Sequence, residues 1–365
     1  MRPAARTRLL LVVPALCLLA GLSLPDTAAA GSPPGGDEPV REVVITASGD
    51  ILTHTSLWRS AQRGARPATY DFVPNFAGIR EVLDGEADIC HLETPLVGKE
   101  PSSYPIFSTP PTLATALRKS GFEGCSTASN HSLDQGLTGI ASTLRILDAA
   151  GLRHSGMRAN ERDSAVALYT TSGGVRVAHL SYTFSTNGIP LPKHAPWSVN
   201  IIDARRMLVA ARTAGAAADL VVLSIHWGNE YQEQPSSTQL RLARELAASG
   251  EVDLIIGHHA HVLQPAEVVN GVPVLYGLGN LWSGQGPWSE KPFGDISAIA
   301  KLHFLVDGQG PRFVGGSYIP TVVNPSGWRV TTAAAAPNRQ RACDAQRHAA
   351  RLLRGMLAPS RTRSC

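Results

Sequence analysis

The sequence predicts an α/β protein in which two sheets lie between two layers of helices. Three observations predict this architecture. Short apolar runs typical of buried strands alternate with amphipathic helical stretches. Antiparallel hairpin signals are added in the second half of the chain. Polar and ionisable residues stand directly after several of the apolar runs, where α/β proteins place their functional sites.

The strands and helices alternate regularly. Strands are expected at 42–48, 88–92, 121–127, 219–225 and 252–256, and helices at 137–150, 205–214 and 238–249. In the first of these helices Ile140, Leu144 and Leu147 share one face, and Gly151 ends it. This alternation is typical of parallel sheets covered by helices.

Turn residues between apolar runs predict three hairpins. They join 165–168 to 175–182 through Ser172-Gly173-Gly174, 266–269 to 272–276 through Asn270-Gly271, and 299–306 to 312–320 through Asp307-Gly308. Beyond about Asn324 the apolar periodicity is lost, apart from an Ala/Arg-rich helical stretch at 339–357.

The N-terminus resembles an export signal. A basic start is followed by an apolar core at 9–24 and by Ala28-Ala29-Ala30, which fits the small-x-small cleavage rule. An uncleaved anchor is the alternative, although the core is short for a spanning helix. We therefore expect an exported protein, secreted or held at the cell envelope. Its parts are a signal peptide (1–30), a linker (31–41), one domain (42–323) and a basic C-terminal tail (324–365).

Composition limits the classes of partner. The chain has 365 residues, 43% of them hydrophobic, so it can bury a large core. The net charge of +4 is small, and the basic excess lies at the two ends. A basic tail can bind nucleic acid, anionic lipid or a polyanion, but most such runs are simply solvated. No zinc-finger or helix-turn-helix pattern is present, so nucleic acid is not an expected partner.

Four cysteines remain after the signal segment, and export permits disulfides. Cys343 and Cys365 can close a loop in the basic tail. Cys90 and Cys125 each end a predicted buried strand and are expected to be neighbours in a parallel sheet. For this second pair we favour two free buried thiols slightly over a disulfide.

Oxygen and nitrogen side chains at strand ends predict a metal site. The expected ligands are Asp50, Glu93, Asn130, His226, His259 and His261. A carboxylate between two cations would reduce their repulsion, and an acid left without such a partner would be expensive to bury. His259 and His261 can bind two neighbouring metals or one. A buried structural histidine is the alternative at position 226, and a turn is the alternative at Asn130.

Other polar residues are expected close to the ligands. His131 suits a general acid or a cation that stabilises an oxyanion. Asp134 can orient His131 or cap the following helix. Glu230 can hold the ring of His226 or contact substrate. His258 is expected to point away from its neighbours and to have a supporting role.

Several common enzyme classes are disfavoured. The sequence contains no Gly-x-Ser-x-Gly elbow, no His-Glu-x-x-His pair and no Gly-x-x-x-x-Gly-Lys loop. These absences argue against serine hydrolases, common zinc peptidases and P-loop enzymes.

Taken together, the motifs resemble the CapA family. The segments that carry the resemblance are Gly49-Asp50, Leu92-Glu93-Thr94-Pro95, Ser129-Asn130-His131 with Asp134-Gln135-Gly136, His226-Trp227-Gly228 with Glu230-Tyr231, Gly257-His258-His259-Ala260-His261 and Leu278-Gly279-Asn280. They lie within about 43–323. The resemblance implies a fold similar to calcineurin-like metallophosphoesterases, with a role in the synthesis or export of poly-γ-glutamate capsules.

The resemblance also implies a role for each position. Asp50 matches the acid of the first strand, Glu93 the bridging carboxylate and Asn130 the amide ligand. His226, His259 and His261 match the imidazole ligands, and His131 the catalytic histidine. The implied cofactors are one or two divalent ions, Mn, Fe or Zn.

The function implied is hydrolysis of a phosphoester or of an anionic polymer, with membrane proteins of capsule synthesis as partners. A non-enzymatic capsule polymer-binding or export factor with a residual metal site is the alternative. A secreted nucleotidase is a third hypothesis.

The chain departs from these patterns at several positions. Leu52 stands where phosphoesterases usually carry a histidine, and His54 is a candidate substitute. His91 stands where the capsule family commonly has asparagine, and can strengthen the site or replace a hydrogen bond. Asn280 lies in a segment that alone would indicate only a loop. The number of metals therefore stays open at the level of sequence.

Overall fold

The fold is known from a computed structural model that describes residues 39–64, 69–98, 100–360 and 365. The signal peptide expected at 1–30 and most of the linker expected at 31–41 lie outside these residues. Among the described helices, none combines the length and apolarity that a membrane span requires.

The first sheet has nine strands. Its order is β16 (Arg329–Thr332), β15 (Gly310–Asn324), β14 (Ile296–Asp307), β1 (Arg41–Leu52), β4 (Ala87–Leu92), β5 (Gly124–Ser126) and β6 (Arg153–Ser155). In this sheet β1, β4, β5 and β6 are parallel to one another, whereas β14 and β15 form an antiparallel hairpin beside β1. Two further strands pair at the sides, β13 (Asn280–Ser283) with β1 and β17 (Ala358–Pro359) with β15.

The second sheet has six strands. Its order is β11 (Ala266–Val269), β12 (Val272–Leu275), β10 (Leu254–His258), β9 (Leu220–His226), β8 (Arg176–Thr183) and β7 (Ala167–Thr170). The four central strands are parallel, and the two outer strands are antiparallel additions. A separate two-stranded ribbon joins β2 (Gln62–Arg63) and β3 (Thr69–Tyr70).

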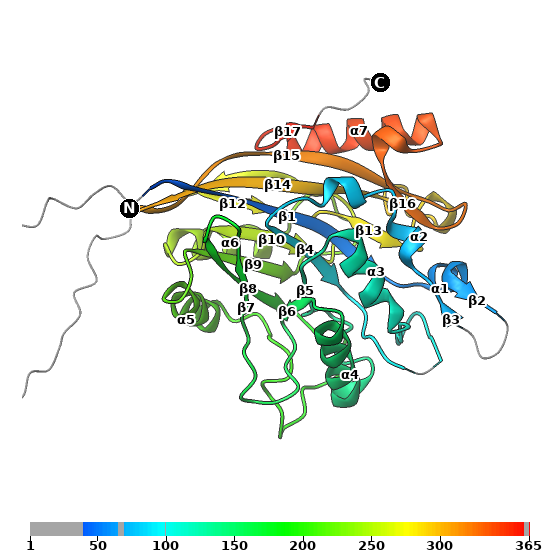
Figure 1. Ribbon diagram of the computed structural model, residues 1–365, viewed down its shortest axis with the longest axis horizontal. Helices are drawn as coiled ribbons and strands as arrows, with labels where there is room; N and C mark the ends of the chain where they lie inside the picture. The colour runs from blue at the N-terminus through cyan, green and yellow to red at the C-terminus, as the bar shows by residue number, and fades with distance from the viewer. Residues whose placement is uncertain (1–38, 65–68, 99, 361–364) are drawn as a thin grey trace, which may run out of the picture.

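Helices cover the outer face of each sheet, and the two sheets face each other (Figure 1). The first sheet carries α1 (Thr55–Ala61), α2 (Val73–Phe76), α3 (Thr112–Ser120) and α4 (Gly136–Ala149). The second sheet carries α5 (Ala204–Gly215) and α6 (Ser237–Ala248). The predicted αββα sandwich with added hairpins is confirmed.

The space between the sheets changes character along the strands. At the amino ends of the strands it is filled by apolar side chains such as Val43, Val222 and Leu254. Towards the carboxyl ends of the same strands, polar side chains such as Ser224 and His226 take their place. The polar part of this layer leads directly to the candidate site.

The chain beyond 323, expected as a basic tail, packs against this core. β16 extends the first sheet, and α7 (Arg339–Leu353) lies over β15 in Figure 1. Its apolar residues, among them Ala345, Ala349 and Leu353, belong to the core between the sheets. Cys343 and Cys365 form a disulfide, as the sequence allowed. The domain boundaries themselves stay a prediction.

One expectation about the cysteines is wrong. Cys90 and Cys125 are opposite each other on the parallel strands β4 and β5, as predicted, but they form a disulfide rather than two free thiols. Their Cα atoms are 4.4 Å apart, within the usual range for such a bond.

Candidate metal centre

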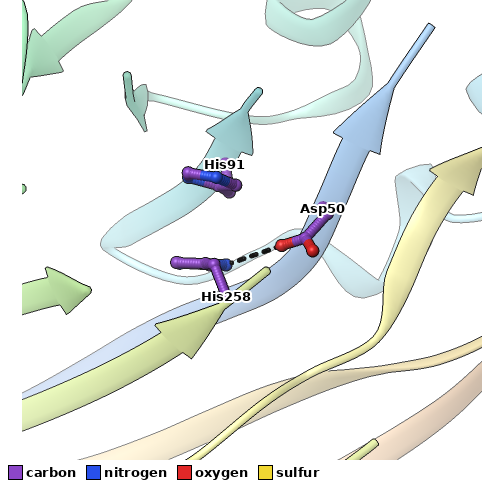
Figure 2. A group of neighbouring side chains, drawn as sticks. All are labelled: Asp50, His91 and His258. Atoms are coloured by element: carbon purple, nitrogen blue, oxygen red, sulfur yellow. Dashed lines mark hydrogen bonds and ion pairs between the residues drawn. The ribbon is translucent and has the colours of Figure 1, made fainter. Parts of the chain in front are cut away.

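Asp50 lies near the carboxyl end of β1, just after an irregularity that follows Ala47. Its carboxylate accepts hydrogen bonds from Nδ1 of His258 (3.0 Å) and from the backbone N–H of His259 (3.1 Å), and lies 3.2 Å from Nδ1 of His261. Figure 2 shows the bond to His258. Burial alone would raise the pKa of Asp50, but the bonds from His258 and His261 hold it well below its ordinary value. Asp50 is therefore an ionised ligand candidate.

Glu93 follows β4 directly and is buried. Neither carboxylate oxygen has a hydrogen-bond partner among the described residues. The nearest imidazole nitrogens are Nε2 of His261 at 3.8 Å and Nε2 of His226 at 3.9 Å from Oε1. Burial raises the pKa of Glu93 to about 8. A buried carboxylate without donors is costly, and a bound cation would remove that cost.

His226 is the last residue of β9 and is fully buried. Its Nε2 lies 2.9 Å from Oδ1 of Asn130, and its Nδ1 lies 2.9 Å from Nε2 of His91. Burial, with smaller effects from His259 and His91, lowers the pKa of His226 well below its ordinary value. A neutral imidazole is the form that binds metals.

His259 and His261 lie in the loop after β10, and both have left-handed backbone conformations, with φ of 84° and 56°. Non-glycine residues adopt this conformation rarely, and it is frequent at functional sites. Burial lowers the pKa of His259 to about 3, and its buried Nδ1 has no hydrogen-bond partner among the described residues. Burial also acts to lower the pKa of His261, but the carboxylates of Glu93 and Asp50 outweigh it and raise the pKa to about 9.

These side chains form two groups that share one residue. Asp50, Glu93 and His261 make the first group, and Glu93, His226 and His259 the second, with the ligand atoms of each group within 4.8 Å of one another. Asn130 contacts the second group through His226. Because the shared carboxylate has two unpartnered oxygens, the residues present fit two cations with Glu93 between them.

A third group, formed by Asp50, His91 and His258, does not fit a metal. The rings of His91 and His258 are stacked, with centroids 4.0 Å apart and planes inclined by 12° (Figure 2). Imidazole lone pairs lie in the ring plane, so two stacked rings do not converge on a common ion. His258 instead donates a hydrogen bond to Asp50, whose carboxylate also lies 3.2 Å from Nδ1 of His261.

Glu230 belongs to a fourth group with His259 and His261. Unlike the other members it is exposed, and it follows β9 rather than ending a buried strand. Within the described chain, no hydrogen bond joins it to the ring of His226. Glu230 is therefore the solvent-exposed member of this group.

His131 is held beside the centre by Asp134. Nδ1 of His131 lies 2.8 Å from Oδ2 of Asp134, which also accepts a hydrogen bond from the backbone N–H of Phe107 (2.7 Å). The ring of Phe107 packs edge-on against His131. Gln135 occupies the N-cap position of α4, and its side chain makes no capping hydrogen bond. Of its two expected roles, Asp134 therefore has the orienting one.

His54, the candidate substitute for the histidine missing at Leu52, directly precedes α1. Its Nδ1 lies 3.1 Å from the carbonyl oxygen of Leu52 and 3.2 Å from the backbone N of Gly284, and it belongs to none of the four groups found in the described chain. Asn280, in contrast, contacts the centre. Its Oδ1 lies 3.0 Å from Nδ1 of His261, and its Nδ2 donates to the carbonyl oxygen of the same residue.

Three residues near the centre were not predicted from the sequence. Ser126 bonds Nδ1 of His91 at 2.8 Å, Phe107 packs against His131, and Phe184 lies with its ring centroid 4.7 Å from that of His259. Ser126 could have been found from its register opposite His91 in the parallel pair of β4 and β5. Phe107 lies in a loop and carries no sequence signal of this kind.

Comparison with known proteins identifies the family. The sequence model of the bacterial capsule synthesis protein PGA_cap matches residues 44–285, more than half of the chain. The PGA biosynthesis protein CapA of Bacillus subtilis (strain 168) is 34% identical over 200 residues, which cover 53% of this chain and 50% of that protein. A probable polyglutamine synthesis accessory protein of Mycobacterium tuberculosis (strain ATCC 25618 / H37Rv) is 28% identical over 251 residues, which cover 62% and 64%. The chain thus spans about half the length of its Bacillus relative.

Two solved structures resemble the chain at low sequence identity. A novel phosphatase of Mycoplasma pneumoniae has a TM-score of 0.49 and 12% identity, covering 78% of this chain and 95% of that one. A 5'-nucleotidase precursor from Thermus thermophilus has a TM-score of 0.47 and 17% identity, covering 85% and 58%.

Proposed function

This chain belongs to the bacterial capsule synthesis protein family PGA_cap, and on that premise we propose that it is an exported, metal-dependent hydrolase. Its proposed substrate is a phosphoester or an anionic polymer such as poly-γ-glutamate. The proposed setting is the synthesis or export of a capsule or another cell-envelope polymer, together with membrane proteins of that pathway.

The observation that carries the proposal is the environment of Glu93. Its two oxygens are buried, have no hydrogen-bond donor within the described chain, and lie between two groups of ligand atoms. Burying such a carboxylate in its ionised form costs free energy, which a bound cation would offset.

The proposed ligands divide between two positions. Asp50 and His261 would hold one cation, and Asn130, His226 and His259 the other, with Glu93 shared. Divalent cations there would provide a nucleophile at neutral pH and neutralise negative charge on the attacked group.

The chain's own residues would then orient the substrate and move a proton. Asp134 fixes the ring of His131 through Nδ1, so Nε2 is left as the atom that can give a proton to a leaving group. Phe184 and Glu230 lie beside His259 and would contact the substrate there.

A second candidate is a non-enzymatic factor that binds or guides a capsule polymer and retains a residual metal site. Leu52 supports this alternative, because the position near Asp50 lacks the histidine that phosphoesterases usually have, and His54 belongs to none of the groups of possible ligands in the described chain. Under this alternative the chain would bind metal without turning over substrate.

Export is part of the proposal. The N-terminal segment has the features of a signal peptide, and the two disulfides, Cys90–Cys125 and Cys343–Cys365, suit an oxidising compartment outside the cytoplasm. Comparing the mass of the protein recovered from outside the cell with that of the full chain would show whether the signal is removed.

The test combines metal analysis with activity. We expect the purified protein to contain divalent metal and to hydrolyse p-nitrophenyl phosphate or poly-γ-glutamate, with activity lost in chelator and restored by metal. His226→Ala and His259→Ala should lose both metal and activity. The exposed His303 provides the control, and His303→Ala should behave as wild type. Metal content with no hydrolysis of either substrate would favour the binding factor, and absence of metal in the wild type would contradict both.

A further inference from the structure

His91 is a buried histidine that contacts the candidate ligand His226 on the side of its ring opposite Glu93 and Asn130. It projects from β4 into the layer between the sheets, where Ser126 and His226 flank it on opposite sides. Its ring is stacked on that of His258, as Figure 2 shows. Both ring nitrogens of His91 are used, Nδ1 by the hydroxyl of Ser126 at 2.8 Å and Nε2 by Nδ1 of His226 at 2.9 Å.

Ser126, His91, His226 and Asn130 form a row of hydrogen-bonded side chains. The positions of the hydrogen atoms in this row can be assigned from Asn130, its last member. Oδ1 of Asn130 carries no hydrogen, so Nε2 of His226 must donate to it across 2.9 Å. Nδ1 of the neutral His226 is then an acceptor, and Nε2–H of His91 donates to it. Nδ1 of His91 is left to accept from the hydroxyl of Ser126. When Nε2 of His226 carries the ring hydrogen, all three hydrogen bonds therefore point from Ser126 towards Asn130.

Metal binding requires the opposite direction. The atom of His226 that faces Glu93 and Asn130 is Nε2, and it can bind a cation only through a lone pair. The ring hydrogen must then be on Nδ1, where it needs an acceptor, because an unpaired N–H in this buried layer would be costly. Within the described chain, the hydrogen-bond partner of that atom is His91.

We propose that His91 is a positioning residue that stabilises the metal-binding tautomer of His226. This inference rests on the proposed metal centre and goes beyond it, because it assigns a role to a residue that binds no metal. A histidine suits the role because a neutral imidazole can donate from one nitrogen and accept at the other, and can exchange the two.

The reversed row leaves no group unsatisfied. Nδ1–H of His226 donates to Nε2 of His91, and Nδ1–H of His91 donates to Oγ of Ser126. The hydroxyl of Ser126 turns to the carbonyl oxygen of Cys90, which lies 3.3 Å away. Each imidazole stays neutral, with one hydrogen before and one after. The hydrogen that leaves Nε2 of His226 passes to solvent, and one proton from solvent returns to the Ser126 end of the row.

Two substitutions at position 91 distinguish the effect of the hydrogen bond to His226 from the effect of filling the buried position. In His91→Leu no acceptor remains for Nδ1–H of His226. In His91→Gln the terminal amide reaches about as far as Nε2 of histidine and can accept that hydrogen. His179→Leu is the matched control. His179 is also buried in the layer between the sheets and bonds Ser224, but it makes no recorded contact with His226 in the described chain.

The test is a zinc titration of the full chain after chelator treatment. We expect His91→Leu to bind zinc about 10- to 100-fold more weakly at the position of His226, the range typical of lost supporting hydrogen bonds. His91→Gln should recover most of that affinity, and His179→Leu should match the wild type. Equal affinity in His91→Leu and wild type, or equal weakening in His179→Leu, would overturn the inference.

A spectroscopic measurement keeps the inference testable if His91→Leu does not fold. Nitrogen-15 NMR of histidine rings in the wild type should show Nε2–H on His226 without zinc and Nδ1–H on His226 and His91 with zinc. Bound zinc with unchanged tautomers would contradict the role of His91 while leaving the metal centre intact. Failure of the wild type to bind zinc would instead contradict the proposed function and, with it, this inference.

Discussion

Glu93 is a buried carboxylate whose burial is compensated by no hydrogen bond in the described chain. Among the buried carboxylates described, it combines complete burial with the absence of any hydrogen-bond donor on either oxygen. Asp50, a few ångströms away, has three donors and a lowered pKa. Two neighbouring carboxylates with opposite pKa shifts are what a centre arranged around one shared ligand would produce.

The metal-free protein should lose stability as Glu93 ionises. The folded pKa of about 8 lies above the ordinary value of 4.5. Ionisation is then easier in the unfolded chain, so this group lowers the free energy of unfolding progressively between about pH 4.5 and pH 8. In chelator, Glu93→Gln should therefore be more stable than wild type at pH 8, by roughly 1–3 kcal/mol.

Urea unfolding with chelator at pH 5 and pH 8 measures this difference. The advantage of Glu93→Gln should shrink at pH 5 and reverse at pH 8 when metal is added, because metal stabilises the wild type alone. A variant that is less stable than wild type at pH 8 without metal would show that Glu93 is satisfied within the protein.

Asp134 should matter for turnover but not for metal. In Asp134→Asn the amide oxygen can still accept from the N–H of Phe107, but the negative charge beside His131 is lost. We expect the rate constant kcat to fall by about 100-fold, a typical effect for general acid catalysis, with metal content unchanged. Loss of metal in this variant would show instead that Asp134 supports the ligands.

The elements of the fold are predictable wherever local pattern decides them. The helix expected at 137–150 is Gly136–Ala149, and the hairpin at Asn270-Gly271 has the expected pairing. β13 was not predicted, because Gly277 and Gly279 stand just before Asn280. The strand conformation of β13 depends on its pairing with β1, which is distant in sequence. Tertiary contacts override local propensity in such segments.

Which strand-end residues come together at the candidate site was largely predictable from the sequence, whereas the residues that contact them from behind were less so. Asp50, Glu93 and His226 stand out because a polar residue ends each apolar run. The bond between His91 and His226 joins two different sheets, and no periodicity reveals such a contact. The same holds for the disulfide Cys90–Cys125, whose register was expected but whose bonding was not.

Gly257 allows β10 to approach the segment after β12. A Cβ atom at this position would lie 1.9 Å from the carbonyl oxygen of Tyr276. We expect Gly257→Ala to reduce the free energy of unfolding by about 2–4 kcal/mol, because backbone must move to admit the methyl group. Gly98→Ala, where nothing lies within 4 Å, is the control and should change stability by less than about 0.5 kcal/mol. Urea unfolding measures both, and equal stability of the two variants would contradict the close approach.

The disulfide between β4 and β5 should hold the strands that carry His91 and Ser126. It closes a loop of 35 residues. Replacing both cysteines by alanine should reduce the free energy of unfolding by about 2–4 kcal/mol. Urea unfolding with metal-loaded protein measures this, and a stability equal to that of the oxidised wild type would indicate that the bond does not form in solution.

Across the whole molecule, the two ends of the strands have different roles: one end packs the apolar core, and the other carries the candidate site. The amino-terminal parts of the strands build the apolar layer between the two sheets, to which α7 contributes side chains next to β14, β15 and β11. Their carboxyl ends bring β1, β4, β9 and β10 together so that residues far apart in sequence meet in one place. The stability of the layer and the geometry of the centre are therefore linked through the same strands.

The central claim is that these side chains hold cations on both sides of Glu93. Its most direct test is a crystal structure of the manganese-loaded protein with anomalous scattering data. We predict two anomalous peaks, one contacted by Asp50 and His261 and the other by Asn130, His226 and His259, each within bonding distance of Glu93. Absence of any peak at Glu93, or manganese bound only elsewhere on the protein, would contradict the account.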